Sequence, residues 1–214
     1  MKAIVIGSTG LVGEHLLQLL DKDTRFTSVS ALVRKPGTLQ SSKINYVIAN
    51  FDQLDPSLIK GDVLFCALGT TLKKAGSKEA QYKIDLTYNF ETAQLAKANG
   101  VNKLAHVSSI GANAKSGNFY LRVKGELEEK LKALNFEKAV VVRPSFILGD
   151  RKEFRLGEKI GIILMNALGF LMIGSLKKYK GIHARQIAKC MIDEVCNTTS
   201  KGFQIIESDN IQHY

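Results

Sequence analysis

Short apolar runs alternate with segments of helical periodicity along the whole chain. The runs are Ala3–Ile6, Val29–Val33, Ile44–Ala49, Asp62–Leu68, Lys103–Ser108, Ala139–Val142 and Gly202–Glu207. Runs of this length that are apolar almost throughout are typical of strands buried on both faces of a parallel sheet. The pattern therefore predicts an α/β fold in which strands alternate with helices.

The helical segments lie between these runs. We expect helices at Leu11–Leu20, Pro56–Ile59, Glu79–Asn99, Tyr120–Leu134 and His183–Cys196. Residues Lys73–Lys78 are polar and are expected to form a loop, whereas Asn99-Gly100 is a favourable helix end. No repeat, low-complexity tract or linker interrupts the pattern, so residues 1–214 are expected to form a single domain.

The first run leads directly into a glycine-rich turn. Gly7, Gly10 and Gly13 have the spacing G-x-x-G-x-x-G and precede the first expected helix. Such a turn presents backbone N–H groups at the positive end of a helix, where a pyrophosphate can bind. Gly7 would permit the sharp turn, Gly10 would let phosphates approach the backbone, and Gly13 would let the helix pack closely on the strand. The turn, which includes Ser8, Thr9, Leu11 and Val12, therefore predicts a dinucleotide site.

The end of the second run indicates which dinucleotide binds. In folds that prefer NAD(H), an acidic residue at this point holds the hydroxyls of the adenosine ribose. Here the position carries Arg34, with Lys35 beside it. A guanidinium can hold a 2′-phosphate through two hydrogen bonds, whereas a carboxylate would repel it. We therefore expect NADP(H) in preference to NAD(H); the alternative is that Arg34 only begins a solvated turn.

Two further strand ends supply candidate cofactor contacts. After the third run, Asn50 or Asp52 could meet the adenine amino group, or either could serve as a turn residue. After the fourth run, the small residue Gly69 would let the backbone pass close to a ribose, and Ala67 and Leu68 adjoin it.

A second group of candidate residues follows the fifth run. Ser108 and Ser109 end that run, and Tyr120 and Lys124 come in the helix expected after it. Residues i and i+4 lie on one face of a helix, so the phenol and the ammonium can point into the same cleft. The ammonium would stabilise a phenolate and could hold ribose hydroxyls, while a serine could hydrogen-bond the substrate oxygen. The Tyr-x-x-x-Lys spacing is common by chance, but no other tyrosine in this chain has a lysine four residues later.

Other chemistry-bearing residues have simpler interpretations. His106 and Cys66 lie inside expected strands, where packed core side chains are more common than catalytic ones. His183 is expected to start the last helix as a structural residue. Cys66, Cys190 and Cys196 have no metal-ligand spacing, and their odd number argues against a disulfide framework. We therefore expect no metal site and a reducing compartment.

The most apolar stretch is GEKIGIILMNALGFLMIG, residues 157–174. It is too short and too often interrupted by glycine to span a bilayer well, so no transmembrane span is expected. The stretch lies in a small C-terminal extension, residues 150–182, on the expected substrate side. Its apolar residues 160–173 could cap the substrate pocket, form a surface for a protein partner or self-association, or enter a membrane interface, in that order of preference.

The charge balance adds a limit on partners. The net charge of +10 favours an anionic cofactor or substrate, or simply a solvated basic surface. Nucleic acid is not expected as a partner, because the basic residues are scattered and no zinc finger, basic arm or aromatic-basic pattern is present. A strand begins almost at the first residue, so we expect no signal peptide and a cytoplasmic location.

In this order, the residues resemble the atypical branch of the short-chain dehydrogenase/reductase superfamily. The resemblance is carried by Gly7/Gly10/Gly13, Arg34, Ala67-Leu68-Gly69, Ser108-Ser109, Tyr120/Lys124 and Arg143-Pro144, and by the stretches FCALGTTLKKAGS, VSSIGANAKSGNFYLRVKGELEEKL and RPSFILGDRKEFRLGE. Within that branch the chain is similar to the group of the human Tat-interacting oxidoreductase-like protein and its bacterial relatives. The resemblance implies a doubly wound, parallel-sheet Rossmann fold.

The resemblance also implies roles for individual residues. The implied NADP(H) contacts are Gly7, Ser8, Thr9, Gly10, Val12, Gly13, Arg34, Phe51, Leu68, Gly69, Tyr120, Lys124, Pro144 and Phe146. Tyr120 is implied as the acid/base, with Ser109, in preference to Ser108, as its partner. Asn50 departs from the family pattern, in which an aspartate facing adenine is expected.

Two functions follow as hypotheses. The first is an NADPH-dependent oxidoreductase of unknown small-molecule substrate, in which Tyr120 protonates the oxyanion, Ser109 orients it and Lys124 tunes Tyr120. The alternative is a regulator that senses NADP(H) and signals to a protein partner. A sugar-nucleotide epimerase or dehydratase is disfavoured, because it generally has a larger C-terminal domain.

Overall fold

The computed structural model describes residues 1–149 and 180–214, and seven parallel strands form its main sheet. They are β1 (Lys2–Ile6), β2 (Ser28–Val33), β3 (Ile44–Ile48), β4 (Val63–Cys66), β5 (Lys103–Val107), β6 (Lys138–Arg143) and β9 (Gly202–Glu207). Their order is β3-β2-β1-β4-β5-β6-β9. The first six follow the doubly wound Rossmann order, which confirms the predicted fold class.

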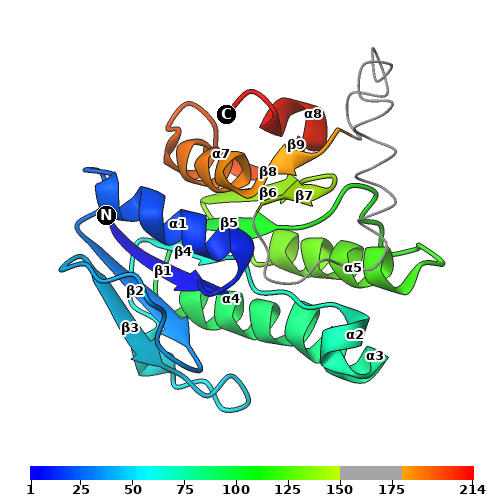
Figure 1. Ribbon diagram of the computed structural model, residues 1–214, viewed down its shortest axis with the longest axis horizontal. Coiled ribbons are helices and arrows are strands. Elements are labelled where there is room, and N and C mark those ends of the chain that lie inside the picture. Colours follow the sequence, from blue (N-terminus) through cyan, green and yellow to red (C-terminus); the bar gives the residue numbers. More distant parts are fainter. Residues whose placement is uncertain (150–179) are drawn as a thin grey trace.

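Helices cover both faces of this sheet (Figure 1). They are α1 (Leu11–Lys22), α2 (Leu72–Ala75), α3 (Lys78–Tyr82), α4 (Tyr88–Ala98), α5 (Phe119–Ala133), α7 (Ala184–Cys196) and α8 (Ser208–Ile211), with a 3-10 turn at Pro56–Leu58. Helices α1 and α7 lie on one face, and α4 and α5 lie on the other. Because both faces are covered, the central strands β1 and β4 are buried almost throughout, which explains their continuous apolar runs.

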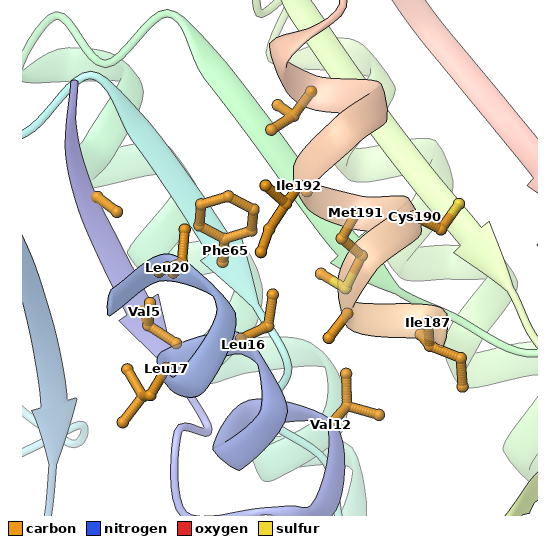
Figure 2. Packing of buried hydrophobic residues seen from close by; sticks show 14 of the residues in the cluster. Val5, Val12, Leu16, Leu17, Leu20, Phe65, Ile187, Cys190, Met191 and Ile192 are labelled. Carbon is orange, nitrogen blue, oxygen red and sulfur yellow. The ribbon is translucent and has the colours of Figure 1, made fainter. Parts of the chain in front are cut away.

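The larger part of the core lies between the sheet and the α1–α7 pair (Figure 2). The α1 side chains that are buried there recur on one helix face: Val12, Leu16, Leu17 and Leu20. Phe65 of β4 lies beneath them, and Met191 and Ile192 of α7 close the cluster from the side. This packing fixes the N-terminal end of α1 against the carboxyl ends of β1 and β4.

The predicted helix at Glu79–Asn99 is confirmed, and it contains a π-helical turn. Helix α3 passes at Tyr82 directly into the π-helical turn at Lys83–Thr87, and α4 then runs to Ala98. The amide of Asn89 donates to the carbonyl oxygens of Leu68, Ile84 and Asp85, each at 3.1 Å. A π turn is an insertion in the ordinary helical ladder, and these bonds occupy backbone oxygens beside it. The predicted end is confirmed, with Asn99 as C-cap and Gly100 at φ +83.

The expected loop at Lys73–Lys78 is wrong, because part of it is helical. One helical turn, α2, begins after Thr71, whose hydroxyl accepts a hydrogen bond from the Lys74 N–H at 3.2 Å. Gly76, at φ +85, ends it. Ser77 then caps α3 in the same way, through the Ala80 N–H at 3.1 Å. These local side-chain caps stabilise two short helices that hydrophobic periodicity does not reveal.

A second sheet of two short parallel strands pairs β7 (Ile147–Leu148) with β8 (Ile182–His183). It brings the chain on either side of residues 150–179 together. His183 is the N-cap of α7, as expected, and its backbone N–H donates to the side chain of Gln186 at 3.1 Å. The predicted apolar cap or interface at 160–173 lies outside the described residues, as does most of the extension at 150–182.

Candidate functional site

The glycine turn joins β1 to α1 at the carboxyl edge of the sheet. Gly7 has φ +77, and a Cβ there would lie 2.4 Å from the carbonyl carbon of Ala67. A Cβ on Gly13 would lie 2.1 Å from the Gly7 carbonyl oxygen. Both positions therefore require glycine, for the turn and for close packing as predicted. A Cβ on Gly10 would lie 3.3 Å from the Gly7 oxygen, so the protein's own packing demands glycine less strictly at this position.

The residues at this turn fit a dinucleotide pyrophosphate. Gly10 is the N-cap of α1, and no side chain caps this helix. Its first backbone N–H groups are therefore suited to an anion. The hydroxyl oxygen of Ser8 is buried and has no hydrogen-bond partner among the described residues. Thr9 and Gly10 are exposed. The turn thus combines donor groups with access from outside, at the carboxyl edge where α/β sheets bind ligands.

The candidate adenosine side of the site lies beyond β2 and β3. Arg34 and Lys35 are exposed directly after β2. Asn50 acts as a turn residue, because its side-chain oxygen accepts the Asp52 N–H at 3.0 Å. The carboxylate of Asp52 is engaged within the protein, 2.5 Å from Lys83 Nζ and 2.6 Å from the Tyr88 hydroxyl. Both residues considered for the adenine contact therefore have partners within the protein: Asn50 bonds the backbone of Asp52, and the Asp52 carboxylate bonds Lys83 and Tyr88.

The remaining residues expected to contact the cofactor, at Phe51 and at the ends of β4 and β6, differ in how far they are buried. Phe51 is buried, with its ring centroid 5.6 Å from that of Tyr88. Ala67 and Leu68 follow β4 beside the glycine turn, and Gly69 is exposed. After β6, Pro144 is buried while the side chain of Phe146 is 41% exposed.

Helix α5 positions the tyrosine and lysine as the spacing predicts. Its N-cap is Asn118, whose side-chain oxygen accepts the Leu121 N–H at 3.2 Å. Tyr120 lies in the first turn, and Lys124 Nζ lies 5.9 Å from the centroid of its ring. Tyr120 lines a cleft of about 350 Å³ together with Thr70, Thr71, Leu72, Lys78, Gln81, Asn118 and Phe119. The structure therefore brings the end of β4 and the start of α5 to one cavity.

Asp85 is a site residue that sequence reasoning missed. Its Oδ1 lies 3.2 Å from Lys124 Nζ, and both side chains are almost fully buried. Its Oδ2 accepts the Thr70 N–H at 2.9 Å. A Cβ on Gly69 would lie 3.2 Å from Asp85 Oδ1 and 3.7 Å from Lys124 Nζ, so a glycine leaves room for this pair. The sequence did contain an indication that Asp85 is buried, because this acidic residue stands between the apolar residues Ile84 and Leu86.

The two serines have different roles in the structure. Ser108 is buried, and its hydroxyl donates to Glu128. Glu128 also accepts two hydrogen bonds from Arg143, at 3.0 and 2.5 Å. Within the described residues, the Ser109 hydroxyl donates one long hydrogen bond, of 3.3 Å, to the Ile110 carbonyl oxygen, and Ser109 is partly exposed. Ser108 therefore belongs to a buried network, whereas Ser109 has the more available hydroxyl.

Gly125 is a second residue that sequence reasoning missed. A Cβ there would lie 2.2 Å from the backbone nitrogen of Ala114 and 2.2 Å from the carbonyl carbon of Asn113. Glycine therefore lets α5 approach the loop that follows Ser108 and Ser109. The signal was present, because a glycine in a helix interior is unfavourable unless packing requires it.

His106 and Cys66 are buried strand residues, as expected. Burial, with the charge of Lys124 as a second cause, lowers the pKa of His106 well below its usual range. Burial raises the pKa of the Cys66 thiol. Both groups are therefore neutral at physiological pH and act as packing residues beneath the site.

In residues 1–149 and 180–214, no group of three or more His, Cys, Asp or Glu side chains could hold a metal ion. Within the same ranges, no helix is long and apolar enough to cross a membrane.

Known proteins resemble this chain over most of its length. The NAD(P)H-binding family matches residues 7–156. "Protein FMP52-1, mitochondrial" of Scheffersomyces stipitis is 43% identical over 157 residues, which cover 71% of this chain and 70% of the relative. "Protein fmp52, mitochondrial" of Emericella nidulans is 34% identical over 226 residues, covering 98% of this chain and 97% of the relative. These names do not confirm the narrower resemblance to the Tat-interacting oxidoreductase-like group.

Solved structures share the fold at low sequence identity. A short chain dehydrogenase family protein from Francisella tularensis has a TM-score of 0.67 and 13% identity, covering 100% of this chain and 99% of that one. A UDP-glucuronic acid 4-epimerase from Bacillus cereus in complex with NAD has a TM-score of 0.72 and 14% identity, covering 96% of this chain and 76% of that one. Both likenesses concern the fold alone.

The names of the relatives also correct one expectation. The cytoplasmic location expected from the sequence is contradicted, because the FMP52 relatives are named as mitochondrial proteins. Neither the cysteine count nor the position of the first strand identifies a compartment within the cell. The family match, the strand order and the geometry of the glycine turn agree with one another. The chain belongs to the NAD(P)H-binding family, with FMP52 proteins among its relatives.

Proposed function

We propose that this protein is an NADP(H)-dependent oxidoreductase that acts on a small carbonyl compound or activated alkene. The observation that carries the proposal is the placement of Tyr120. Its side chain lines the cleft at the start of α5, with Lys124 buried 5.9 Å from its ring. A purely structural tyrosine would not need a buried, paired lysine one helical turn away.

The bound dinucleotide would supply a hydride to the substrate. Its pyrophosphate would be held by the backbone at Gly7–Gly13, and Lys124 would reach the ribose side of the site. In the reductive direction Tyr120 donates its phenolic proton to the oxygen that gains negative charge. Ser109 donates a hydrogen bond to the same oxygen, and the Lys124 ammonium stabilises the phenolate that remains.

The preference for NADP(H) rests on Arg34 and Lys35. Both side chains are exposed after β2, and no carboxylate precedes them at that strand end. A guanidinium there matches the geometry of a phosphate monoester and has no matching role toward two ribose hydroxyls.

A second candidate function is an NADP(H) sensor without efficient turnover. The apolar residues 160–173 would then provide the partner surface. The mitochondrial names of the relatives support the proposal that this protein also acts in mitochondria.

The deciding experiment replaces Tyr120 with Phe. We expect the Tyr120→Phe variant to bind NADPH like the wild type and to lose about 10²- to 10⁴-fold in kcat on every carbonyl compound that the wild type reduces. Tyr214→Phe is the matched control, because Tyr214 donates its hydroxyl to Glu194, outside the cleft.

Two results would contradict the oxidoreductase proposal. One is unchanged turnover in Tyr120→Phe. The other is a wild type that reduces no member of a broad carbonyl panel while NADPH changes its oligomeric state, which would favour the sensor.

A further inference from the structure

The cleft beside Tyr120 has a basic wall that the proposed hydride chemistry does not use. Lys78 and Gln81 of α3 line it opposite the start of α5. The remaining lining residues are neutral: Thr70, Thr71, Leu72, Asn118, Phe119 and Tyr120. Among the described residues, no acidic side chain contributes to the lining. The cleft therefore has a positive character that is not balanced within its own wall.

The charge of Lys78 is not paired with a described carboxylate. Its Nζ lies 5.8 Å from the centroid of the Phe119 ring, and the described residues place no acidic oxygen within ion-pair distance of it. Glu79 is the next residue, and hydrogen bonding by its own backbone and by Ser77 lowers the pKa of its carboxyl. Arg122 also contacts the Phe119 ring, at 5.7 Å, but it pairs with Glu126 at 3.8 Å.

Gln81 is the second polar residue of this wall. The residue as a whole is only 4% exposed, and it lines the cleft beside Lys78. Its amide can therefore donate a hydrogen bond to a ligand in the cleft. Helix α2 adds two exposed lysines, Lys73 and Lys74, close to Leu72 at the cleft. Their charge would attract an anion toward the opening.

We propose that the substrate of this cleft carries an anionic group, a carboxylate or a phosphate monoester, in addition to its reactive carbonyl. Lys78 binds this group through a charge-assisted hydrogen bond, and the Gln81 amide donates a second one. Leu72 and Phe119 contact the apolar body between the two ends of the substrate. This inference rests on the proposed oxidoreductase function, and it deepens that function by naming the class of substrate.

The test compares three aldehydes that share one aromatic body. 4-Carboxybenzaldehyde and 4-formylphenyl phosphate carry the anion, and methyl 4-formylbenzoate is neutral. Binding to the NADP⁺-loaded protein is measured by isothermal titration calorimetry, and kcat/KM is measured separately with NADPH. We expect the anionic probes to bind about tenfold more tightly than the ester, which is the effect of one hydrogen bond to a charged group. We expect kcat/KM to follow the same order.

The matched variants are Lys78→Gln and Lys130→Gln. Lys130 also places its Nζ over a phenylalanine ring, 5.0 Å from the centroid of Phe90, but outside the cleft. Lys78→Gln should remove the preference for anions without changing NADPH affinity, and Lys130→Gln should leave both unchanged.

The outcomes separate this inference from the function on which it rests. If no aldehyde is reduced but the pattern of binding holds, the oxidoreductase proposal fails and the anion site stands. The inference is overturned if the ester binds as tightly as the acids, or if no anionic probe binds at millimolar concentration. It is also overturned if the two lysine variants have equal effects, or if Lys78→Gln weakens NADPH binding.

Discussion

The ammonium of Lys124 is held by the carboxylate of Asp85 at 3.2 Å, in a region from which solvent is almost excluded. The pair carries no net charge, so its electrostatic field is weaker than that of an unpaired ammonium. The same ion pair fixes where the ammonium lies, and Asp85 in turn is held by the backbone N–H of Thr70. At the scale of single residues, Asp85 is therefore a positioning residue that ties the end of β4 to α5.

Asp85→Asn tests this role. The change keeps an oxygen for the Thr70 N–H but leaves the buried Lys124 without its carboxylate, so the free energy of unfolding should fall by about 3 kcal/mol. Urea denaturation measures the change. Glu137→Gln is the control, because its ion pair with Lys201 is exposed and should contribute under about 1 kcal/mol. Equal effects in the two variants would show that Asp85 contributes no more than a surface charge.

Replacement of Arg34 by Gln tests the other end of the site. The guanidinium is exposed after β2 and would meet the phosphate that distinguishes NADPH from NADH. We expect Arg34→Gln to weaken NADPH binding by about tenfold, the effect of one lost charge-assisted contact, with NADH binding unchanged. Fluorescence titration of each nucleotide measures this difference. Equal losses for the two nucleotides would argue against a contact with the 2′-phosphate.

At the scale of elements, α5 and the loop after β5 approach each other at Gly125. A glycine-to-alanine change in a helix interior normally stabilises the helix by about 1 kcal/mol. At Gly125 the added Cβ would lie 2.2 Å from backbone atoms of the loop, and backbone cannot yield cheaply. For Gly125→Ala, helix propensity therefore predicts a higher free energy of unfolding, whereas packing against the loop predicts a lower one.

We expect packing to prevail in Gly125→Ala, which should lose about 2 kcal/mol of unfolding free energy. The added methyl group should also displace the loop that follows Ser109, and we expect this displacement to lower turnover. Gly117→Ala is the control, since a Cβ there meets nothing within 4 Å. A Gly125→Ala variant as stable as the wild type would mean that α5 can move away from the loop without cost.

The α1–α7 pair links the phosphate turn to the core of the whole molecule. Leu16 is fully buried between the sheet and α7 (Figure 2). Leu16→Ala should lower the free energy of unfolding by about 3 kcal/mol, because it removes buried methyl groups and leaves a cavity. Leu72→Ala, at a position 47% exposed, should change it by under about 1 kcal/mol. Chemical denaturation of both variants measures the contrast, and similar values would contradict the core assignment.

The sequence predicted a structural feature correctly where that feature depends on residue type and on spacing along the chain. The glycines at positions 7 and 13 are required by the turn and by close packing, and their spacing predicted both correctly. The four-residue spacing of Tyr120 and Lys124 predicted a shared helix face, which the structure confirms. The apolar runs predicted all seven strands of the main sheet. The pattern is most continuous in the central strands β1 and β4, which are buried almost throughout because helices cover both faces.

The amino-acid sequence by itself thus determined the alternation of strands and helices, the phosphate turn and the one-face pairing of Tyr120 with Lys124. These features depend on neighbours along the chain, through backbone freedom and helical or strand periodicity. Only the tertiary structure decided that a π turn lies at Lys83–Thr87 within the long helix, that Asp85 pairs with Lys124, and that Ser108 binds Glu128 while Ser109 has the more available hydroxyl. Several of these contacts join residues far apart in the sequence, such as Thr70 with Asp85, Ser108 with Glu128 and Asp85 with Lys124. Side-chain burial and hydrogen bonding across elements, rather than local propensity, govern such contacts.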